Sequence, residues 1–404
     1  MSIDDIGVAV IGAGMAGKAH AAAYRNATAV YRAALPPVRL VAIADAYEPV
    51  AADTAGRWGY ERYETSWQRI VDADDIDVVS IVVANALHRE IADALLAAGK
   101  HVLCEKPLSD SIQDAEAMVR AAEGASGIAR LGLTFRRSPG FAFLRSLVQD
   151  GTLGRVFHVD GAYWTDYGSD PRTPISWRYK GPAGSGALAD VGSHLSYLAE
   201  FVAGSDITAV RGGHLSTVIA ERPKPLGVIS GRGDVEVSEE TDTVDNDDLA
   251  VFSADFANGA SGTLQMSRVA AGHPNTLTVA VHGERGAARF DFRNPGQVEL
   301  YLPDENPVNA GWRTIVLGPG HPYWQGGLPM DARGVGIGQN DGFVFQARAM
   351  LEEVAGLPAA ESLPRNASFA AGLRNLRLLD AATRSALAGG ASVEVPPVED
   401  VLVR

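Results

Sequence analysis

The sequence has little cysteine, no long apolar run and fewer basic than acidic residues. Cys104 is the single cysteine among 404 residues, which excludes an intrachain disulfide and a zinc site built on several thiolates. No apolar run approaches the roughly 20 residues that a membrane helix needs, and the N-terminus is acidic where a signal peptide would be basic. The 35 basic and 49 acidic residues give a net charge of −14, which disfavours nucleic acids and anionic membranes. We therefore expect a cytoplasmic protein with a small-molecule ligand and no metal ion.

Glycine is abundant, and three glycines near the N-terminus have the Gly-x-Gly-x-x-Gly spacing. The apolar run 8–11 before them predicts a buried strand, and the alanine-rich segment 18–34 after them predicts a helix. Such a turn lets the backbone approach a pyrophosphate, and the N–H groups and dipole at the start of the helix favour the negative charge. We therefore predict a dinucleotide site, with cofactor contacts at Gly12, Gly14, Met15, Ala16 and Gly17.

A second apolar strand, 39–44, places Asp45 at its carboxyl end. A carboxylate at this position can accept hydrogen bonds from the adenosine ribose hydroxyls and would repel a 2′-phosphate. No arginine lies among the next three residues. The pattern favours NAD over NADP, although Asp45 could also be an ordinary turn residue.

Strands and helices continue to alternate after Asp45. Strands are expected at 77–83, 100–104 and 128–134, and helices at 67–71, 88–98 and 111–125. This alternation predicts an α/β Rossmann domain, residues 1–136, with a parallel, doubly wound sheet. Ligands of such sheets bind at the carboxyl ends of the strands, where Ala84, Asn85, Glu105 and Lys106 fall.

Residues 137–404 have a different pattern, with one early helix at 141–149 followed by many strands. The expected strands are 155–164, 249–256, 260–268, 276–282, 287–292, 298–302 and 313–316. They predict an α+β domain with a large, mostly antiparallel open sheet, and we expect this second domain to bind the substrate. A sheet face without helices usually meets another subunit, so we expect a homodimer or homotetramer through that face.

Two stretches of this second part are expected to be loops. Residues 221–248 mix glycine, proline and acids, which is typical of a solvated excursion. Residues 303–341 are rich in glycine and proline but hold Trp312, Tyr323 and Trp324. These aromatic side chains either anchor their loop or shape the substrate cleft.

Lys106 lies between Glu105 and Pro107, at the end of the strand 100–104. The residue before a proline is kept out of helical conformations, and a Lys-Pro bond can be cis. If Lys106 points into the cleft, its ammonium would bind a substrate oxygen and stabilise a developing alkoxide. The alternative is a surface lysine in a turn.

The segment 184–194 holds the second pair of candidate catalytic residues. If it is helical, Asp190 and His194 lie four residues apart on one face. The carboxylate could then orient the imidazole or bind a substrate hydroxyl, and the histidine could act as a general base near neutral pH. The alternative is a local ion pair on the surface of a helix.

Taken together, these motifs resemble the glucose–fructose oxidoreductase/inositol dehydrogenase (Gfo/Idh/MocA) family. The resemblance rests on the glycine turn with His20, on Glu105-Lys106-Pro107, on Asp190-x-Gly192-x-His194, and on the run from 176–178 into 183–186, within residues 5 to 300. It implies a Rossmann domain with an open sheet, an NAD(P) cofactor, oxidation of a secondary hydroxyl of a sugar or cyclitol, and catalysis by Lys106, Asp190 and His194.

The resemblance also implies further contacts. Segments 135–137, 164–166, 176–178 and 221–223 resemble levoglucosan dehydrogenases and related glycoside dehydrogenases. The cofactor candidates added by the resemblance are Asn85, His88, Trp177 and Arg178, and the substrate candidates are Arg136, Trp164 and Asp166. One departure is Ala84, where the family usually has a proline.

The resulting hypothesis is an NAD-dependent oxidoreductase that oxidises a secondary hydroxyl of a sugar, an anhydrosugar or a glycoside. His194 would remove the hydroxyl proton and Lys106 would stabilise the oxygen, while Asp190 holds both substrate and imidazole. An inositol or other cyclitol dehydrogenase is one alternative. A regulatory protein that binds NAD(P) and senses sugar without catalysis is another, because fold alone does not determine function.

Overall fold

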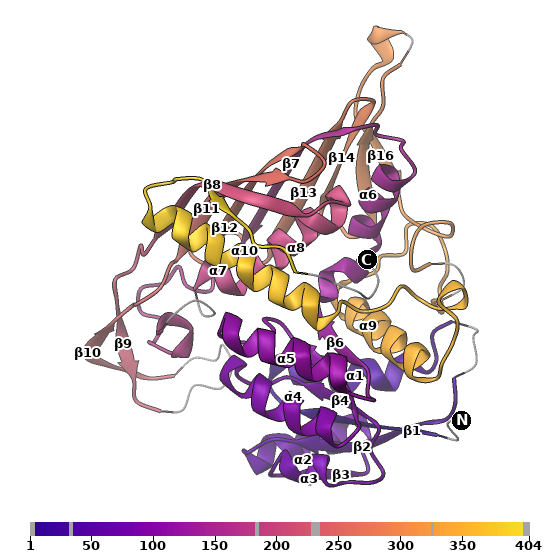
Figure 1. Cartoon of the computed structure of the whole chain (residues 1–404), viewed down its shortest axis with the longest axis vertical. Helices are drawn as coiled ribbons and strands as arrows, with labels where there is room; N and C mark the ends of the chain where they lie inside the picture. The colour runs from indigo at the N-terminus through magenta and orange to yellow at the C-terminus, as the bar shows by residue number, and fades with distance from the viewer. Residues whose placement is uncertain are drawn as a thin grey trace.

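The computed structural model describes residues 5–31, 35–181, 186–227, 235–304, 306–324 and 327–398. These residues form a parallel sheet and a larger open sheet, each with helices packed against it (Figure 1). Within the described ranges, no helix is long and apolar enough to cross a bilayer.

The parallel sheet has six strands in the order β3-β2-β1-β4-β5-β6. Its central strand β1 is buried along its whole length, as expected for an apolar strand with a neighbour on each side. The predicted doubly wound α/β architecture is confirmed. The strands are β1 (Ile6–Ile11), β2 (Val38–Ala44), β3 (Arg62–Glu64), β4 (Val78–Ile81), β5 (His101–Glu105) and β6 (Ala129–Gly132), and the intervening helices are α1 (Met15–Ala27), α2 (Glu48–Trp58), α3 (Gln68–Val71), α4 (His88–Ala97) and α5 (Ile112–Gly124).

Helix α1 ends at Ala27, well before the expected residue 34. The helix does not continue to residue 34, because Tyr31 takes up a left-handed conformation, with φ 63°. There its N–H donates to Gly327 O and its hydroxyl to Tyr323 O, at 2.9 Å for the hydroxyl. Contacts with a segment some 290 positions later in the chain thus end this helix.

A helix from the C-terminal part of the chain completes the layer around α1. Helix α9 (Gln339–Val354) packs on α1, and Val344, Met350 and Leu351 share a core with Ile6 and Tyr24. Figure 1 shows α9 beside α1. Residues far beyond 136 therefore stabilise the cofactor-binding half, and the division of the chain at residue 136 stays a prediction.

The second sheet has nine strands in the order β16-β15-β14-β13-β7-β12-β11-β8-β17. Its pairs are antiparallel except β7 with β12, so the predicted open, mostly antiparallel sheet is confirmed. The strands are β7 (Val156–Trp164), β8 (Ile207–Ser216), β11 (Leu249–Phe256), β12 (Ser261–Ser267), β13 (Thr276–Gly283), β14 (Gly286–Asp291), β15 (Gln297–Tyr301), β16 (Arg313–Val316) and β17 (Val393–Glu394).

One face of this sheet is covered by α6 (Pro139–Gln149), α8 (Gly192–Ala203) and α10 (Phe369–Leu387) (Figure 1). Along β11 the residues alternate between buried and partly exposed, which is the pattern of a strand with one covered face. The other face presents partly exposed side chains such as Val251 and Ser253. This is the face through which we predict that subunits associate.

The expectation that residues 221–248 form only a loop is wrong. They include β9 (Glu221–Pro225) and β10 (Val237–Thr243), an antiparallel pair, whereas residues 228–234 lie outside the described part. Both strands are largely polar and exposed, so they lack the alternating apolar pattern by which a strand is found in a sequence. The buried exception is Arg222, whose side chain is fully enclosed.

Aromatic side chains anchor the stretch 303–341, which is one of the two roles that the sequence left open for them. Tyr323 and Trp324 are buried and pack with Ile337 and with Phe345, which lies on α9. Trp312 is the exposed one, and it lies against Arg289 of β14. The stretch 303–341 also contains β16 and the first residues of α9, so it is not loop throughout.

Candidate active site

The glycine turn between β1 and α1 has the geometry that a diphosphate needs. Gly12 adopts φ 100°, and a Cβ there would lie 2.1 Å from Val82 O. A Cβ on Gly17 would lie 1.9 Å from Gly12 O, whereas nothing lies within 4 Å of a Cβ on Gly14. Gly12 and Gly17 therefore let the turn pack closely against neighbouring backbone, whereas the side of the turn at Gly14 is open to a ligand. No side chain caps α1, so its first N–H groups face this open side, which fits the diphosphate of a dinucleotide.

Asp45 lies next to the turn, as predicted. One carboxylate oxygen accepts the N–H of Ala13 at 2.8 Å, and the other accepts the N–H of Tyr47 at 2.9 Å. A carboxylate has about four lone-pair sites, so two remain for ribose hydroxyls. Met15 and Ala16, in the first turn of α1, are exposed and partly exposed on the same side. These residues fit a cofactor without a 2′-phosphate.

The loop after β4 keeps its shape without the proline of the family pattern. Ala84 has φ −64° and ψ 140°, which are angles of a proline, and the short helix η1 (Asn85–Leu87) follows. His88 is fully buried, and its ring nitrogens lie 3.0 Å from Pro107 O and 3.2 Å from Val83 O. His88 thus joins the loops after β4 and β5 from a buried position, and a direct cofactor contact at His88 stays a prediction.

Lys106 lies at the end of β5, after which the Lys106–Pro107 bond is cis. Its ammonium donates to Asp190 Oδ1 at 3.1 Å and to the backbone oxygen of Asp190 at 2.9 Å. The two side chains are 16% and 29% exposed, so the pair is partly accessible but largely sheltered from bulk water. The first two predicted catalytic residues therefore meet.

A chain of polar contacts holds the backbone of Lys106 from behind. One oxygen of the Glu105 carboxylate accepts the N–H of Lys106 at 3.1 Å, and the other lies 3.0 Å from His20 Nε2. The Nδ1 atom of His20 contacts Ser80 Oγ, which also contacts the Tyr24 hydroxyl, each at 3.0 Å. Glu105, predicted as a cofactor contact, thus links Lys106 to the core of the Rossmann sheet.

Asp190 and His194 do not lie on one regular helix. Helix α7 (Ala187–Asp190) ends at Asp190, and α8 begins at Gly192. Asp247 sets the start of α7, because its Oδ2 accepts the N–H of Leu188 at 2.7 Å. A Cβ on residue 186 would lie 2.0 Å from Asp247 Oδ1, which explains the glycine there. Residues 184 and 185 of the same motif lie outside the described part.

His194 lies in the first turn of α8 against aromatic side chains. Phe135 meets its ring edge-on at a centroid distance of 4.8 Å, and Tyr163 of β7 lies 6.2 Å away. Burial and the nearby ammonium of Lys106 hold the pKa of His194 well below its usual value, and the charge of Asp190 opposes them only in part. The imidazole is therefore neutral near pH 7 and able to accept a proton.

Tyr167 is a site residue that the sequence did not reveal. Its hydroxyl donates to Asp190 Oδ2 at 3.0 Å, so the carboxylate is held on one side by Lys106 and on the other by Tyr167. The loop that carries Tyr167 is fixed by Arg222, which donates to Gly168 O and, at 2.9 Å, to Asp170 O. The only sequence signal was its position next to Asp166, at the end of a predicted strand.

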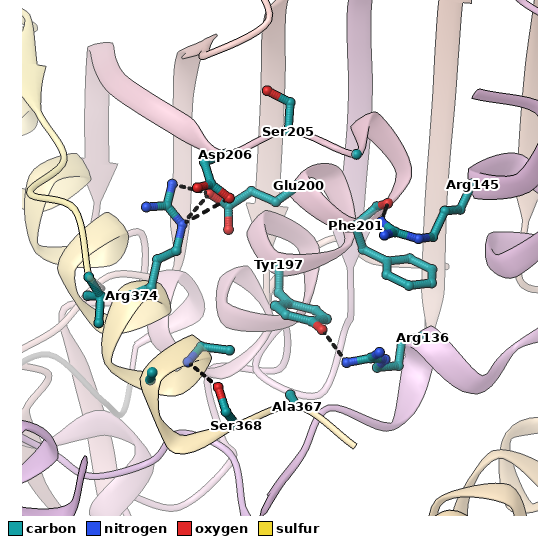
Figure 2. A pocket seen from close by; sticks show the side chains of 14 residues that line it. Arg136, Arg145, Tyr197, Glu200, Phe201, Ser205, Asp206, Ala367, Ser368 and Arg374 are labelled. Carbon is teal, nitrogen blue, oxygen red and sulfur yellow. Dashed lines mark hydrogen bonds and ion pairs between the residues drawn. The ribbon is translucent and has the colours of Figure 1, made fainter. Parts of the chain in front are cut away.

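Two predicted substrate contacts lie elsewhere. Successive side chains of a strand point to opposite faces, and on β7 it is Tyr163 that faces His194, while Trp164 packs on His273. Arg136 donates to Tyr197 on α8 at 2.7 Å and lines a pocket bordered by neither Lys106 nor His194 (Figure 2). Neither Trp164 nor Arg136 joins the three predicted catalytic residues.

The remaining predicted contacts lie in loops beside the site. The Asp166 backbone oxygen accepts the N–H of Ser169, in the loop of Tyr167. Trp177 is exposed in the short helix η3 (Trp177–Tyr179), with the Arg178 guanidinium 4.4 Å from its ring centroid. Arg268 fixes η3 by donating to Arg178 O at 2.8 Å. Cofactor contacts at Trp177 and Arg178 stay predictions.

The assembled groups suit oxidation of an alcohol. An ammonium, a carboxylate, a tyrosine hydroxyl and a neutral imidazole gather between the end of β5 and the start of α8. The imidazole can take a proton, and the ammonium can stabilise negative charge on an oxygen. No metal-binding group of His, Cys, Asp and Glu occurs among the described residues.

Comparisons with known proteins agree with this geometry. Residues 6–133 match the family model described as "Oxidoreductase family, NAD-binding Rossmann fold", and residues 141–289 match the "GFO/IDH/MocA C-terminal domain". The levoglucosan dehydrogenase of Pseudarthrobacter phenanthrenivorans is 35% identical over 98% of this chain and all of its own length. The inositol 2-dehydrogenase of Rhizobium meliloti is 27% identical over 73% of this chain and 78% of its own. A solved levoglucosan dehydrogenase in complex with NADH and levoglucosan has a TM-score of 0.86 and 33% identity, covering 97% of this chain and 100% of that one.

Proposed function

The chain belongs to the Gfo/Idh/MocA family of NAD-binding oxidoreductases, and we propose that it is the NAD-dependent dehydrogenase of an anhydrosugar, with levoglucosan as the first candidate substrate. The catalytic part of this proposal rests on the Lys106–Asp190 ion pair beside a neutral His194. The substrate class rests on the relative named for levoglucosan, which matches almost the whole chain, including the second domain.

In the proposed reaction, His194 accepts the proton of the substrate hydroxyl. Lys106 donates a hydrogen bond to the same oxygen and stabilises it while the carbonyl forms. Bound NAD supplies the acceptor for the hydride that leaves the carbon. Asp190 holds the ammonium in place and offers an acceptor to the substrate, and Tyr167 keeps the Asp190 carboxylate from rotating away. One proton and one hydride leave the alcohol, which yields the ketone.

The proposal is tested by mixing the purified protein with NAD or NADP and following the absorbance of the reduced nicotinamide. Levoglucosan, free sugars, glycosides and inositols serve as substrates. We expect reduction of NAD with levoglucosan, little reduction of NADP, and loss of turnover in His194→Ala. A control is Arg384→Gln, which changes an exposed arginine of α10 that pairs with Asp380 on the same helix.

Two other outcomes would point to other functions. Turnover with inositols in place of levoglucosan would make the chain a cyclitol dehydrogenase, which the 27% identical inositol 2-dehydrogenase supports. Tight NAD binding with no turnover of any alcohol would contradict the dehydrogenase and favour a sugar-sensing regulatory protein.

We also propose that two or four copies associate through the open face of the nine-stranded sheet, in the cytoplasm. The supporting observation is the row of partly exposed side chains on β11, with the apolar Val251 among them. Val251→Asp should shift the mass in solution towards the monomer, as measured by light scattering. An unchanged mass would exclude this face.

A further inference from the structure

A pocket lies beside the helix that carries His194. Its cavity of about 140 Å³ is bordered by α8, by the first turn of α10, by α6 and by the short helix η2 (Thr134–Arg137). Figure 2 shows Arg136 and Arg145 on one side of this pocket and Arg374 on the other, with Tyr197 between them. The pocket includes neither Lys106 nor Asp190, so it is separate from the candidate active site.

The carboxylates of the pocket are already paired. Glu200 accepts from Arg374 at 2.7 Å, and Asp206 lies 3.6 Å from the same guanidinium. Both acids therefore compensate Arg374, on the left of Figure 2. They leave the opposite side of the pocket without a negative charge.

Arg136 and Arg145 have no carboxylate within ion-pair distance among the described residues. Arg136 donates to the Tyr197 hydroxyl, and its Nε is buried without a hydrogen-bond partner. Arg145 donates to the backbone oxygen of Phe201 and, with the Gln149 amide turned so that its oxygen faces the guanidinium, to that oxygen at 3.1 and 3.2 Å; all of these acceptors are neutral. The two guanidinium carbons lie 5.4 and 4.7 Å from the centroid of the same Phe201 ring, so both cations border the same part of the pocket.

Arg137, which follows Arg136 in η2, is a third cation without a carboxylate partner among the described residues. Arg137 is fully buried and donates to Asn366 and, more weakly, to the Tyr323 hydroxyl, and its Nε also lacks a partner. Burial lowers the pKa of Arg137 and of Arg145, and the charge of Arg136 lowers both further. Buried charges without a counterion are costly, so a cluster of this kind favours an anion from solution or from the chain.

We propose that this pocket is an oxyanion site, in which the guanidinium groups of Arg136 and Arg145 bind a carboxylate or phosphate over the ring of Phe201. A planar guanidinium suits such anions because its N–H groups form paired hydrogen bonds. The site is coupled to the candidate active site, because η2 carries Arg136 and also Phe135, which packs on His194.

The anion could come from two sources with the same chemistry. One is a free oxyanion such as phosphate. The other is the chain itself, because Val398 lines the pocket and is followed in the sequence by Glu399 and Asp400. The double variant E399Q/D400N removes the second source without changing the length of the chain.

The experiment is calorimetric titration of inorganic phosphate into the full chain saturated with NAD, so that the diphosphate site on α1 is already filled. Sodium chloride at equal ionic strength serves as the reference. We expect binding that weakens at least tenfold in Arg145→Gln, since one charged hydrogen-bond donor is lost, and a smaller loss in Arg145→Lys. The matched control is Arg384→Gln, an exposed arginine of α10 paired with Asp380.

Each outcome decides the proposal. Phosphate binding in the unmodified chain that depends on Arg145 supports a free oxyanion. Binding that appears only in E399Q/D400N supports the carboxylates of the chain as the occupant. Binding that persists in Arg145→Gln, or no binding in either background, overturns the proposal. None of these readouts depends on turnover, so the result stands whether or not the proposed substrate is correct.

Discussion

Replacing Tyr167 by phenylalanine tests the part of the active site that only the structure revealed. The change deletes the hydroxyl that donates to Asp190 Oδ2 at 3.0 Å and leaves the ring in place. A hydrogen bond to a charged group contributes about 1.5–3 kcal/mol. Asp190 is 29% exposed, so water can replace part of this bond, and we take the lower end of the range. About 1.5 kcal/mol corresponds to a fall of roughly tenfold in kcat.

The assay is steady-state turnover of levoglucosan with NAD, together with NAD affinity from fluorescence titration. We expect kcat to fall while NAD affinity is unchanged, because Tyr167 acts on Asp190 and, through it, on Lys106. The matched control is Tyr63→Phe, which removes an exposed hydroxyl that donates to Glu48 at 2.9 Å. A kcat within twofold of the unmodified enzyme in Tyr167→Phe would refute the view that this hydroxyl positions the carboxylate.

Three further predictions concern the base, the glycine turn and the loop after β4. Turnover should fall by at least about a hundredfold in His194→Ala. In the unmodified enzyme, activity should be lost only when the pH drops below the pKa of His194, which lies below the usual 6.5 of histidine because burial and the charge of Lys106 favour the neutral imidazole. Gly17→Ala should abolish NAD binding in a titration, since the new methyl would lie 1.9 Å from Gly12 O. Ala84→Pro should raise the free energy of unfolding in urea by about 0.4–1 kcal/mol, because Ala84 already has φ −64°; a lower stability would show that its N–H or its surroundings exclude a proline.

The Rossmann half could be predicted because its signals are local. Gly17 is required by a contact within the same strand-turn-helix unit, because a Cβ there would meet Gly12 O, and Asp45 follows directly from the end of β2. The predicted end of α1 was wrong because residues 323 and 327 hold Tyr31 in a non-helical conformation, and no local sequence pattern indicates these contacts. The role of α9 in covering α1 was missed for the same reason.

The second half shows how a site depends on register and on distant loops. Trp164 and Tyr163 are neighbours in the sequence, and only the pairing of β7 with its neighbours determines which of them faces His194. Tyr167 reaches Asp190 because Arg222 clamps its loop from β9, a strand that its polar sequence does not reveal. The three predicted catalytic residues were thus visible in the sequence, while Tyr167 and the loops that support the site were not.

In the proposed reaction, the charges of the site explain why Lys106, Asp190 and His194 would act together. Before reaction Lys106 is positive, Asp190 is negative and His194 is neutral, so the group has no net charge in its sheltered position. Proton transfer from the hydroxyl to His194 creates one positive and one negative charge, and the ammonium is already beside the oxygen that becomes negative. The same ammonium lowers the pKa of His194, so the group that stabilises the alkoxide also makes the histidine a weaker base. Asp190 reduces this effect, because its negative charge beside Lys106 weakens the repulsion between the ammonium and the imidazolium. Removing Asp190 should therefore lower the pKa of His194 further and weaken the base, an effect beyond any lost contact with the sugar.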